Sequence, residues 1–339
     1  MSWLRDWLAM GRVANLPTIV SNVMLGCGLG IFVRSWEFEI WRLVVPCVVG
    51  CLLYLGGCFL NDWWDCKWDA VNKPERALPS GRVARWKALL ATVFCWVAAA
   101  GLSVLLGWAV FGVVVGVIGV TIGFTVIHHA TALSAPLMGL CRGMLYVIGF
   151  LGQEWSTSYG TGWVGGASEW MSVVTKVMGL GPELGGDLIL KTEAIQGIGI
   201  PALGLVAFIS GLSMFIRAEN LPVVPRGKVV LGIALMAFAA LTHTVSWMKF
   251  YPGLSVGALL VFVAFLVWGI LRVKSSVRVG VSWLLATVAL VDLVMALPLG
   301  VAFSRAHGSF SLFEGAVFPL VSVLAFGLAL VLQRVAPAT

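Results

Sequence analysis

Residues 108–127 read WAVFGVVVGVIGVTIGFTVI, a run of 20 residues without a charged or amide side chain. A helix of that length rises about 30 Å, which matches the thickness of the hydrocarbon core of a bilayer. A helix that is apolar on every side is typical of a membrane span or of the centre of a large protein. The run therefore predicts a membrane-spanning helix.

Further runs of similar length and hydropathy lie on either side of it. The predicted spans are residues 14–33, 43–60, 86–106, 108–127, 136–151, 200–216, 229–247, 254–271, 279–303 and 315–332. Because two of these runs are short and two are joined by almost no loop, the count could be nine or ten. The predicted fold class is all-α, a polytopic transmembrane helical bundle, with the whole chain 1–339 as one domain.

The composition excludes most other classes of protein. Of the 339 residues, 60% are hydrophobic and only 11% are charged, and the mean hydropathy is +0.99. A soluble domain is about 25% charged, so soluble globular, disordered and coiled-coil proteins are all excluded. The net charge of +7 needs no nucleic-acid partner, because basic residues gather in the cytoplasmic loops of membrane proteins.

The distribution of basic residues predicts the orientation of the chain. If the N-terminus is cytoplasmic, the inside segments hold fifteen of the 22 Lys and Arg residues and the outside loops hold six, while Arg142 lies inside the fifth span. This asymmetry favours a multi-pass protein of the inner (cytoplasmic) membrane with both termini cytoplasmic. The long segment 153–199 contains no spanning run and is predicted to be an extracytoplasmic loop insertion.

The fourth span also carries small residues at a spacing typical of close helix packing. Glycine occurs in the pattern Gly-x-x-x-Gly at residues 112–116 and again at residues 119–123. Such pairs allow two helix backbones to approach closely. We expect another helix of the bundle to pack against this face.

One polar segment stands out, residues 61–82, which read NDWWDCKWDAVNKPERALPSGR. It begins where the second span ends. At 100° per residue, Asp62, Asp65 and Asp69 lie within about 60° of one another, on one stripe of a helix that continues the span. Carboxylates this close repel one another unless a cation lies among them. Oxygen ligands of this kind suit Mg²⁺, and Asn61 can add an amide oxygen.

The residues after this stripe predict a sharp turn. The residue before Pro74 avoids the α-helical conformation, so the helix should end there and the chain can bring Arg76 back over the acids. A guanidinium group matches the oxygens of a phosphate. Acids that hold a metal beside a cation indicate binding of a diphosphate. The alternative is a juxtamembrane helix whose acids only face water.

The pattern Asn-Asp-x-x-Asp-x-x-x-Asp, followed by Asn-x-Pro-x-Arg-x-Leu-Pro-Ser-Gly up to Gly81, resembles the first signature of the UbiA superfamily of intramembrane prenyltransferases. The segment PLMGLCRG at residues 136–143 is similar to the UbiA-like branch called EboC. The resemblance implies a central lipid-accessible cavity and Mg²⁺-dependent transfer of a prenyl group from a prenyl diphosphate to a lipophilic acceptor. The catalytic residues that it implies are Asp62, Asp65, Asp69 and Arg76.

The chain departs from the family pattern after the sixth span, where the family has a second motif, Asp-x-x-x-Asp. Residues 213–226 contain no aspartate and a single acid, Glu219. The metal ligands expected are therefore Asp62, Asp65, Asp69 and Glu219. The cations expected to bind substrate near this loop are Arg217, Arg226 and Lys228. By a loose alignment, His129 stands near the place of a diphosphate-binding lysine of the family.

Arg142 lies several residues inside a span, where a charge usually faces a cavity or a partner. It is expected either to line the cavity and bind substrate or to be paired or snorkelling, and Asp292 could pair with it or with His243. Two functions remain open. One is the prenyltransferase, and the other is a non-catalytic UbiA-like protein that binds or helps export a lipophilic secondary metabolite. The intact first motif favours the enzyme, and the missing second motif favours the alternative.

Overall fold

The computed structural model describes residues 2–32, 38–128, 131, 133–153, 195–217, 226–275, 277–306 and 312–335. These residues form helices and no strand. In chain order the elements are α1 (Ser2–Met10), η1 (Val13–Asn15), α2 (Leu16–Gly30), α3 (Ile40–Asn72), α4 (Arg85–Val104), α5 (Trp108–Ile127), α6 (Ser134–Leu151), η3 (Ile195–Gly199), α9 (Ile200–Arg217), α10 (Arg226–Met248), α11 (Pro252–Ser275), α12 (Val277–Ala286), α13 (Val288–Ala306) and α14 (Leu312–Val335).

Ten spans of the described chain are long and apolar enough to cross a bilayer. They coincide with the ten runs found in the sequence and confirm the predicted helical bundle. The ninth span, Val279–Arg305, is interrupted at Thr287, which separates α12 from α13. Of the predicted insertion 153–199, residues 154–194 lie outside the described residues.

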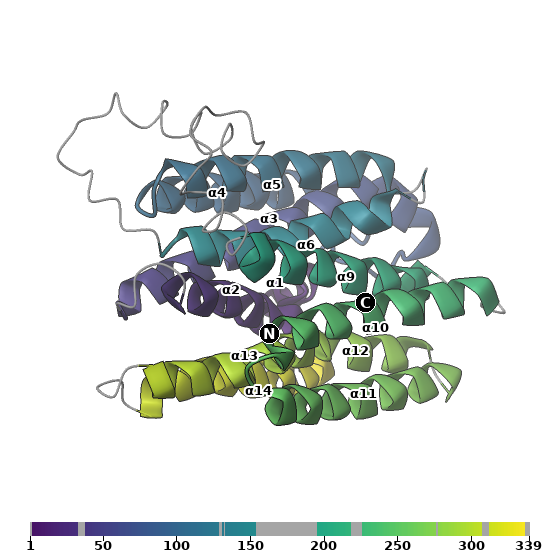
Figure 1. The fold of residues 1–339 in the computed structure, drawn as a ribbon. Coiled ribbons are helices and arrows are strands. Elements are labelled where there is room, and N and C mark those ends of the chain that lie inside the picture. Colours follow the sequence, from purple (N-terminus) through teal and green to yellow (C-terminus); the bar gives the residue numbers. More distant parts are fainter. Residues whose placement is uncertain are drawn as a thin grey trace.

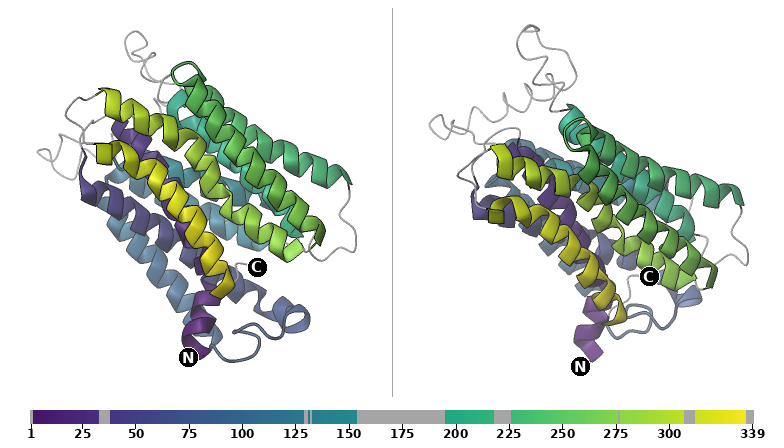
Figure 2. Two further views of the ribbon diagram at one scale, coloured as in Figure 1. Left: turned by 90° about the horizontal axis from the view of Figure 1, so that it is seen from below. Right: turned by 60° about the horizontal axis from the view of Figure 1, so that its bottom comes forward.

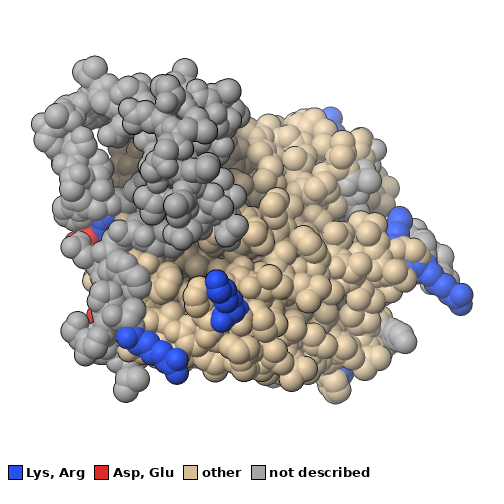
Figure 3. Space-filling model, viewed as in Figure 1, with Lys and Arg blue, Asp and Glu red and all other residues tan. Residues whose placement is uncertain are grey.

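The spans run nearly parallel to one another in a bundle, with α3, α4 and α5 on one side and α11 to α14 on the other (Figure 1). Helix α2 lies between them and packs against α6, α14, α3 and α13. Both termini lie toward the same end of the bundle (Figure 2), as an even number of spans requires. Much of the surface in Figure 3 carries no charged side chain, which suits contact with lipid.

Helix α4 exposes large apolar side chains and buries small ones. In α4 the large side chains Leu90, Phe94 and Val97 are exposed. The buried residues of this helix are small: Ala88, Thr92, Cys95, Ala99 and Ser103. This arrangement is possible because lipid solvates large apolar side chains, while small ones allow helices to approach closely.

Glycines produce very close helix contacts, among them those between α2 and α6, but not at three glycines of α5. A Cβ atom added at Gly26 would lie 2.2 Å from the carbonyl oxygen of Tyr146, and one at Gly149 would lie 2.2 Å from that of Val23. On α5, by contrast, a Cβ at residues 116, 119 or 123 would meet no atom within 4 Å. The close helix contact expected from the spacing is therefore not made at these three positions within the described chain.

Helix α3 has 33 residues, about 50 Å at 1.5 Å per residue. It is longer than a bilayer needs, so its last turns carry the acidic motif beyond the span. The helix ends at Asn72, two residues before Pro74, as the sequence predicts. The following turn returns toward α3 through a hydrogen bond from the backbone N–H of Lys73 to the carbonyl oxygen of Asp69 (2.7 Å) and one from Arg76 to Lys73 (3.1 Å).

Candidate active site

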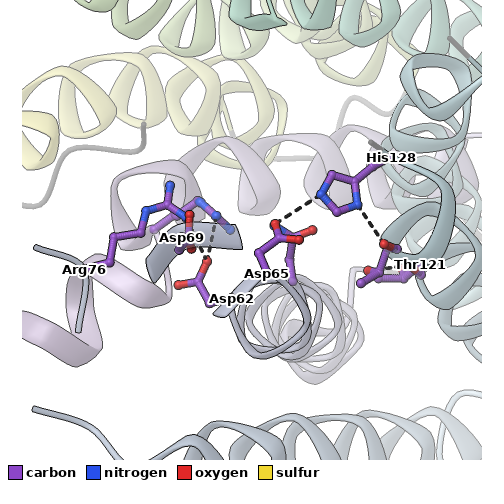
Figure 4. Close-up of polar contacts among 9 residues, drawn as sticks. Asp62, Asp65, Asp69, Arg76, Thr121 and His128 are labelled. Atoms are coloured by element: carbon purple, nitrogen blue, oxygen red, sulfur yellow. Dashed lines mark hydrogen bonds and ion pairs between the residues drawn. The ribbon is translucent and has the colours of Figure 1, made fainter. Parts of the chain in front are cut away.

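The three aspartates of α3 are buried at the end of the bundle where α3 ends and the chain turns toward α4. Asp62, Asp65 and Asp69 are only 8%, 6% and 2% exposed. Figure 4 shows their side chains on one side of the helix, together with Arg76 and His128. A solvated juxtamembrane stripe would be exposed, so the structure contradicts that alternative.

Two arginines neutralise part of this acidic stripe. Nη1 of Arg76 donates to Oδ2 of Asp69 at 2.8 Å and lies 3.8 Å from Oδ1 of Asp62. Nη2 of Arg12 donates to the same Oδ1 of Asp62 at 3.0 Å. The turn after α3 thus does bring Arg76 over the acids, as predicted from its sequence. Arg12, which was not predicted, comes from the segment between α1 and η1 and contacts the same oxygen of Asp62.

Arg12 reaches the stripe because the chain turns sharply between α1 and η1. Its backbone is left-handed, with φ of 44°, and it is the one non-glycine residue with positive φ among those that the structure describes. Such a conformation is strained for a side chain with a Cβ. Burial is the largest single influence and lowers the pKa of the guanidinium, but Asp62, Cys58 and Tyr54 together raise it by more. Arg12 therefore stays charged beside the motif.

His128, at the end of α5, occupies the far side of the stripe. Its Nε2 lies 3.1 Å from Oδ2 of Asp65, and its Nδ1 lies 2.7 Å from the carbonyl oxygen of Thr125. Because a carbonyl oxygen only accepts hydrogen bonds, Nδ1 carries a proton. Asn61 also donates to Asp65, at 3.2 Å. The sequence pointed to His129 at this place; that residue lies outside the described part of the chain.

A cavity of about 320 Å³ opens beside the motif. Its polar wall is formed by Arg12, Asn61, Lys73 and Arg76. The rest of the wall is mostly apolar and comes from α2, α3, α5, α6, α9 and α12: Ile19, Leu53, Val117, Phe124, Met138, Leu145, Ile209, Leu212 and Leu285. A space that is cationic at one end and apolar beyond it can hold a molecule with an anionic head and a hydrocarbon chain.

Arg142 also lines this cavity, but deeper in the bundle. Its side chain lies over the ring of Tyr54, with 5.5 Å from Cζ to the ring centroid. Tyr54 precedes Asp62 on α3 by eight residues, a rise of roughly 12 Å. Nη1 of Arg142 donates to Asn22 and to Thr18, at 2.9 and 3.1 Å. Arg142 is therefore a hydrogen-bonded cavity residue and does not snorkel.

The other predicted residues lie away from the described cavity wall. Arg226 and Lys228 are exposed in the first turn of α10. They lie at the motif end of the bundle, because α9 and α10 connect there, but they do not line the cavity. Glu219 and the side chain of Arg217 lie outside the described residues.

Two buried oxygen atoms at the motif could serve a metal ion. Oδ1 of Asn61 and Oδ1 of Asp69 accept no hydrogen bond from any described residue. Within the described ranges, no three acidic, histidine or cysteine side chains converge on one point, since Asp62 and Asp69 pair with arginines. Mg²⁺ needs only one or two carboxylates when water and substrate phosphate complete its ligands. The oxygen donors present fit an ion of that kind.

The part of the chain that carries this site is similar to proteins of a known family. Residues 23–175 match the UbiA prenyltransferase family, which confirms the resemblance found in the motif. The matched part contains the three aspartates, Arg76, His128 and Arg142, whereas Arg12 precedes it.

Curated relatives share this region at low identity. Digeranylgeranylglyceryl phosphate synthase of Korarchaeum cryptofilum is 29% identical over 114 residues, which are 34% of this chain and 39% of the relative. The enzyme of that name from Saccharolobus solfataricus is 31% identical over 104 residues, which are 30% of this chain and 36% of the relative. The matched segments thus span less than two fifths of these relatives.

Two solved structures share the fold over nearly their whole length. A structure described as digeranylgeranylglyceryl phosphate synthase in membranes superimposes with a TM-score of 0.55 at 15% identity, covering 89% of this chain and 99% of that one. The apo structure of a UbiA homolog from Aeropyrum pernix K1 gives a TM-score of 0.52 at 12% identity, covering 95% and 98%. At this identity the likeness concerns the fold, and it extends beyond the part that matches the family.

Proposed function

Because residues 23–175 are those of the UbiA prenyltransferase family, we propose that this chain transfers a prenyl group from a prenyl diphosphate to a lipophilic acceptor within the membrane, with Mg²⁺ as its cofactor. One observation carries the proposal. Three buried aspartates and two arginines that pair with them stand at the cationic end of an apolar cavity. A cavity for a neutral lipid has no need of such a cluster.

The diphosphate group is proposed to bind at this cationic end. Arg12, Lys73 and Arg76 line it, and arginine is suited to phosphate because its planar guanidinium group offers two parallel donors. The prenyl chain would then extend along the apolar wall. Charge develops on the diphosphate as the allylic carbon–oxygen bond breaks, so fixed cations at this place favour the reaction.

Asp62, Asp65, Asp69 and Asn61 are the residues proposed to hold Mg²⁺, with Glu219 as a further ligand from the loop before α10. When bound, this ion would supply positive charge to the diphosphate leaving group. In this structure Asp62 and Asp69 form ion pairs with Arg12 and Arg76. These arginines are proposed to leave the aspartates and to contact the diphosphate when substrate binds. Arg217, Arg226, Lys228 and His129 remain candidates for further contacts with substrate.

The second candidate function is binding or export of a lipophilic metabolite without catalysis. It is supported by the loop between α9 and α10, where Glu219 is the single acid and no aspartate occurs in residues 213–226. The same cavity would serve both functions. They differ in whether a bound prenyl diphosphate is consumed.

Binding and turnover measured on one purified protein separate the two. We expect farnesyl or geranylgeranyl diphosphate to bind only with Mg²⁺, and Asp62→Asn and Asp65→Asn to weaken binding by at least about tenfold, since each removes a charged ligand. Asp6→Asn is the matched control, because Asp6 pairs with Arg82 on the surface. Release of diphosphate with a lipophilic acceptor supports the enzyme, and Mg²⁺-dependent binding without release supports the alternative. Equal binding by all variants would contradict the proposed role of the aspartates and with it the proposed enzyme.

A further inference from the structure

A chain of buried polar side chains leads from the cavity into the centre of the bundle. Arg142 donates to Oδ1 of Asn22 at 2.9 Å, and Nδ2 of Asn22 donates to both carboxylate oxygens of Asp292, at 3.0 and 2.9 Å. Tyr146 donates to Asp292 and contacts His243. Asn22, Tyr146, His243 and Asp292 have no exposed surface, and Arg142 is 7% exposed. The chain joins α6, α2, α13 and α10.

Asp292 determines which way the amide of Asn22 faces. A carboxylate accepts hydrogen bonds, so the NH₂ group of Asn22 must face Asp292 and its oxygen must face the other way. That oxygen then accepts from Nη1 of Arg142. If residue 292 were an amide, Asn22 could equally turn its NH₂ group toward Arg142. The NH₂ group of Asn22 and the guanidinium N–H of Arg142, both donors, would then face each other.

Hydrogen-bond donors surround the carboxylate of Asp292. Besides Asn22, the hydroxyl groups of Ser21 and Tyr146 donate to it. Nδ1 of His243 lies 2.8 Å from the carbonyl oxygen of Ala239, and Nε2 lies 3.1 Å from the hydroxyl of Tyr146. Asn22 stands between Asp292 and Arg142, which donates to Asn22 and Thr18 and forms no ion pair with any described residue.

Arg142 therefore offers a positive charge to the cavity. Its Nε and Nη2 donate to no residue in the described ranges, while its side chain lines the cavity. Stacking on Tyr54 stabilises the cation only in part. A buried cation without an anionic partner is unfavourable, and an anionic ligand removes that penalty.

We propose that Asn22, Asp292, Tyr146 and His243 are positioning residues, which hold Arg142 as a cation without a directly paired anion, and that Arg142 binds an anionic group of a lipophilic ligand in the deep half of the cavity. This site lies about two helical turns beyond the acids of α3, apart from the diphosphate site. The inference rests on the proposed function only in taking the cavity as the place where substrate binds.

The test compares two ligands of the same chain length, decanoate and decanol, by equilibrium dialysis against protein in nanodiscs of neutral lipid, with empty nanodiscs to correct for partition into lipid. Wild type should bind decanoate at least about tenfold more tightly than decanol, as expected for charge-assisted hydrogen bonds. Arg142→Gln should abolish the preference, and Asp292→Asn should greatly reduce it although Arg142 is still present.

Ser21→Ala is the matched control for a purely structural role. Ser21 donates to the same carboxylate of Asp292 but does not contact Arg142. This variant should therefore keep the preference for decanoate even if its melting temperature is lower than that of wild type. The proposal is overturned if Arg142→Gln keeps the preference, or if Ser21→Ala and Asp292→Asn lose it equally. Failure of the proposed function would give a different result. Wild type would then bind no geranylgeranyl diphosphate in the presence of Mg²⁺ but would still prefer decanoate.

Discussion

Arg12 combines a strained backbone with a charge that faces a carboxylate. Its left-handed φ of 44° is unfavourable by roughly 1–2 kcal/mol for a residue with a Cβ, and glycine avoids that strain. Arg12→Gly and Arg12→Ala both remove the contact with Asp62, so we expect both to weaken binding of prenyl diphosphate about tenfold. The glycine variant should unfold at the higher temperature of the two.

Arg82→Gln is the control for these variants, because Arg82 pairs with Asp6 on the surface of the same end. It should bind prenyl diphosphate like wild type. If Arg12→Gly bound the diphosphate as well as wild type, Arg12 would serve only to neutralise Asp62.

The cations around the motif also limit how many metal ions the site needs. Arg12, Lys73 and Arg76 already line its cationic end, and the loop before α10 offers only Glu219. We expect a Mg²⁺ titration of diphosphate binding to show at most one tightly held ion, and Glu219→Gln to weaken that ion. Two cooperative equivalents in wild type would show that further ligands complete a second metal site, and a Glu219→Gln protein equal to wild type would exclude Glu219 as a ligand.

The sequence predicted the residues of this site that stand close together in the chain. The stripe of Asp62, Asp65 and Asp69 follows from helical periodicity, and the return of Arg76 follows from Pro74. Arg12 and His128 were missed because other helices bring them to α3, and periodicity within one helix says nothing of its neighbours. A signal for Arg12 was nevertheless present, since a cation that directly precedes the first span lies at the same membrane face as the motif.

Among the helices, the contact between α2 and α6 leaves no room for a side chain at its glycines. A Cβ on Gly26 would lie 2.2 Å from the carbonyl oxygen of Tyr146, so Gly26→Ala must push the two backbones apart. We expect a loss of about 1–3 kcal/mol, measured as a lower melting temperature in detergent. Gly119→Ala on α5 is the matched control, because a Cβ there meets no described atom within 4 Å. It should leave the stability unchanged or raise it by up to about 1 kcal/mol, through better helix propensity.

Length and hydropathy predicted the spans well, because the bilayer imposes both on every crossing helix. They could not predict which glycines lie at helix contacts. The Gly-x-x-x-Gly pairs of α5 and the pair Gly26 and Gly30 of α2 have the same spacing, yet a Cβ at residues 116, 119 or 123 meets no described atom within 4 Å, whereas Gly26 packs against α6. Gly149 makes an equally close contact although it belongs to no such pair. Which face of a span turns inward depends on its neighbours, as the position of α2 between α6 and α14 shows.

The ten spans and the basic residues together predict the orientation of the whole molecule in the membrane. Helix α14 packs against α2 and η1, so the two termini share one end of the bundle with the turn after α3 and with the start of α10. Most Lys and Arg residues lie at this end, which favours the cytoplasmic side. In a variant without its native cysteines, Ser80→Cys and Lys228→Cys should react with a membrane-impermeant maleimide only in inverted vesicles. Ser168→Cys, in the proposed extracytoplasmic segment 153–199, should react in intact cells. Labelling of residues 80 and 168 from the same side would contradict this topology. It would also place the diphosphate site and the long segment on one face of the membrane.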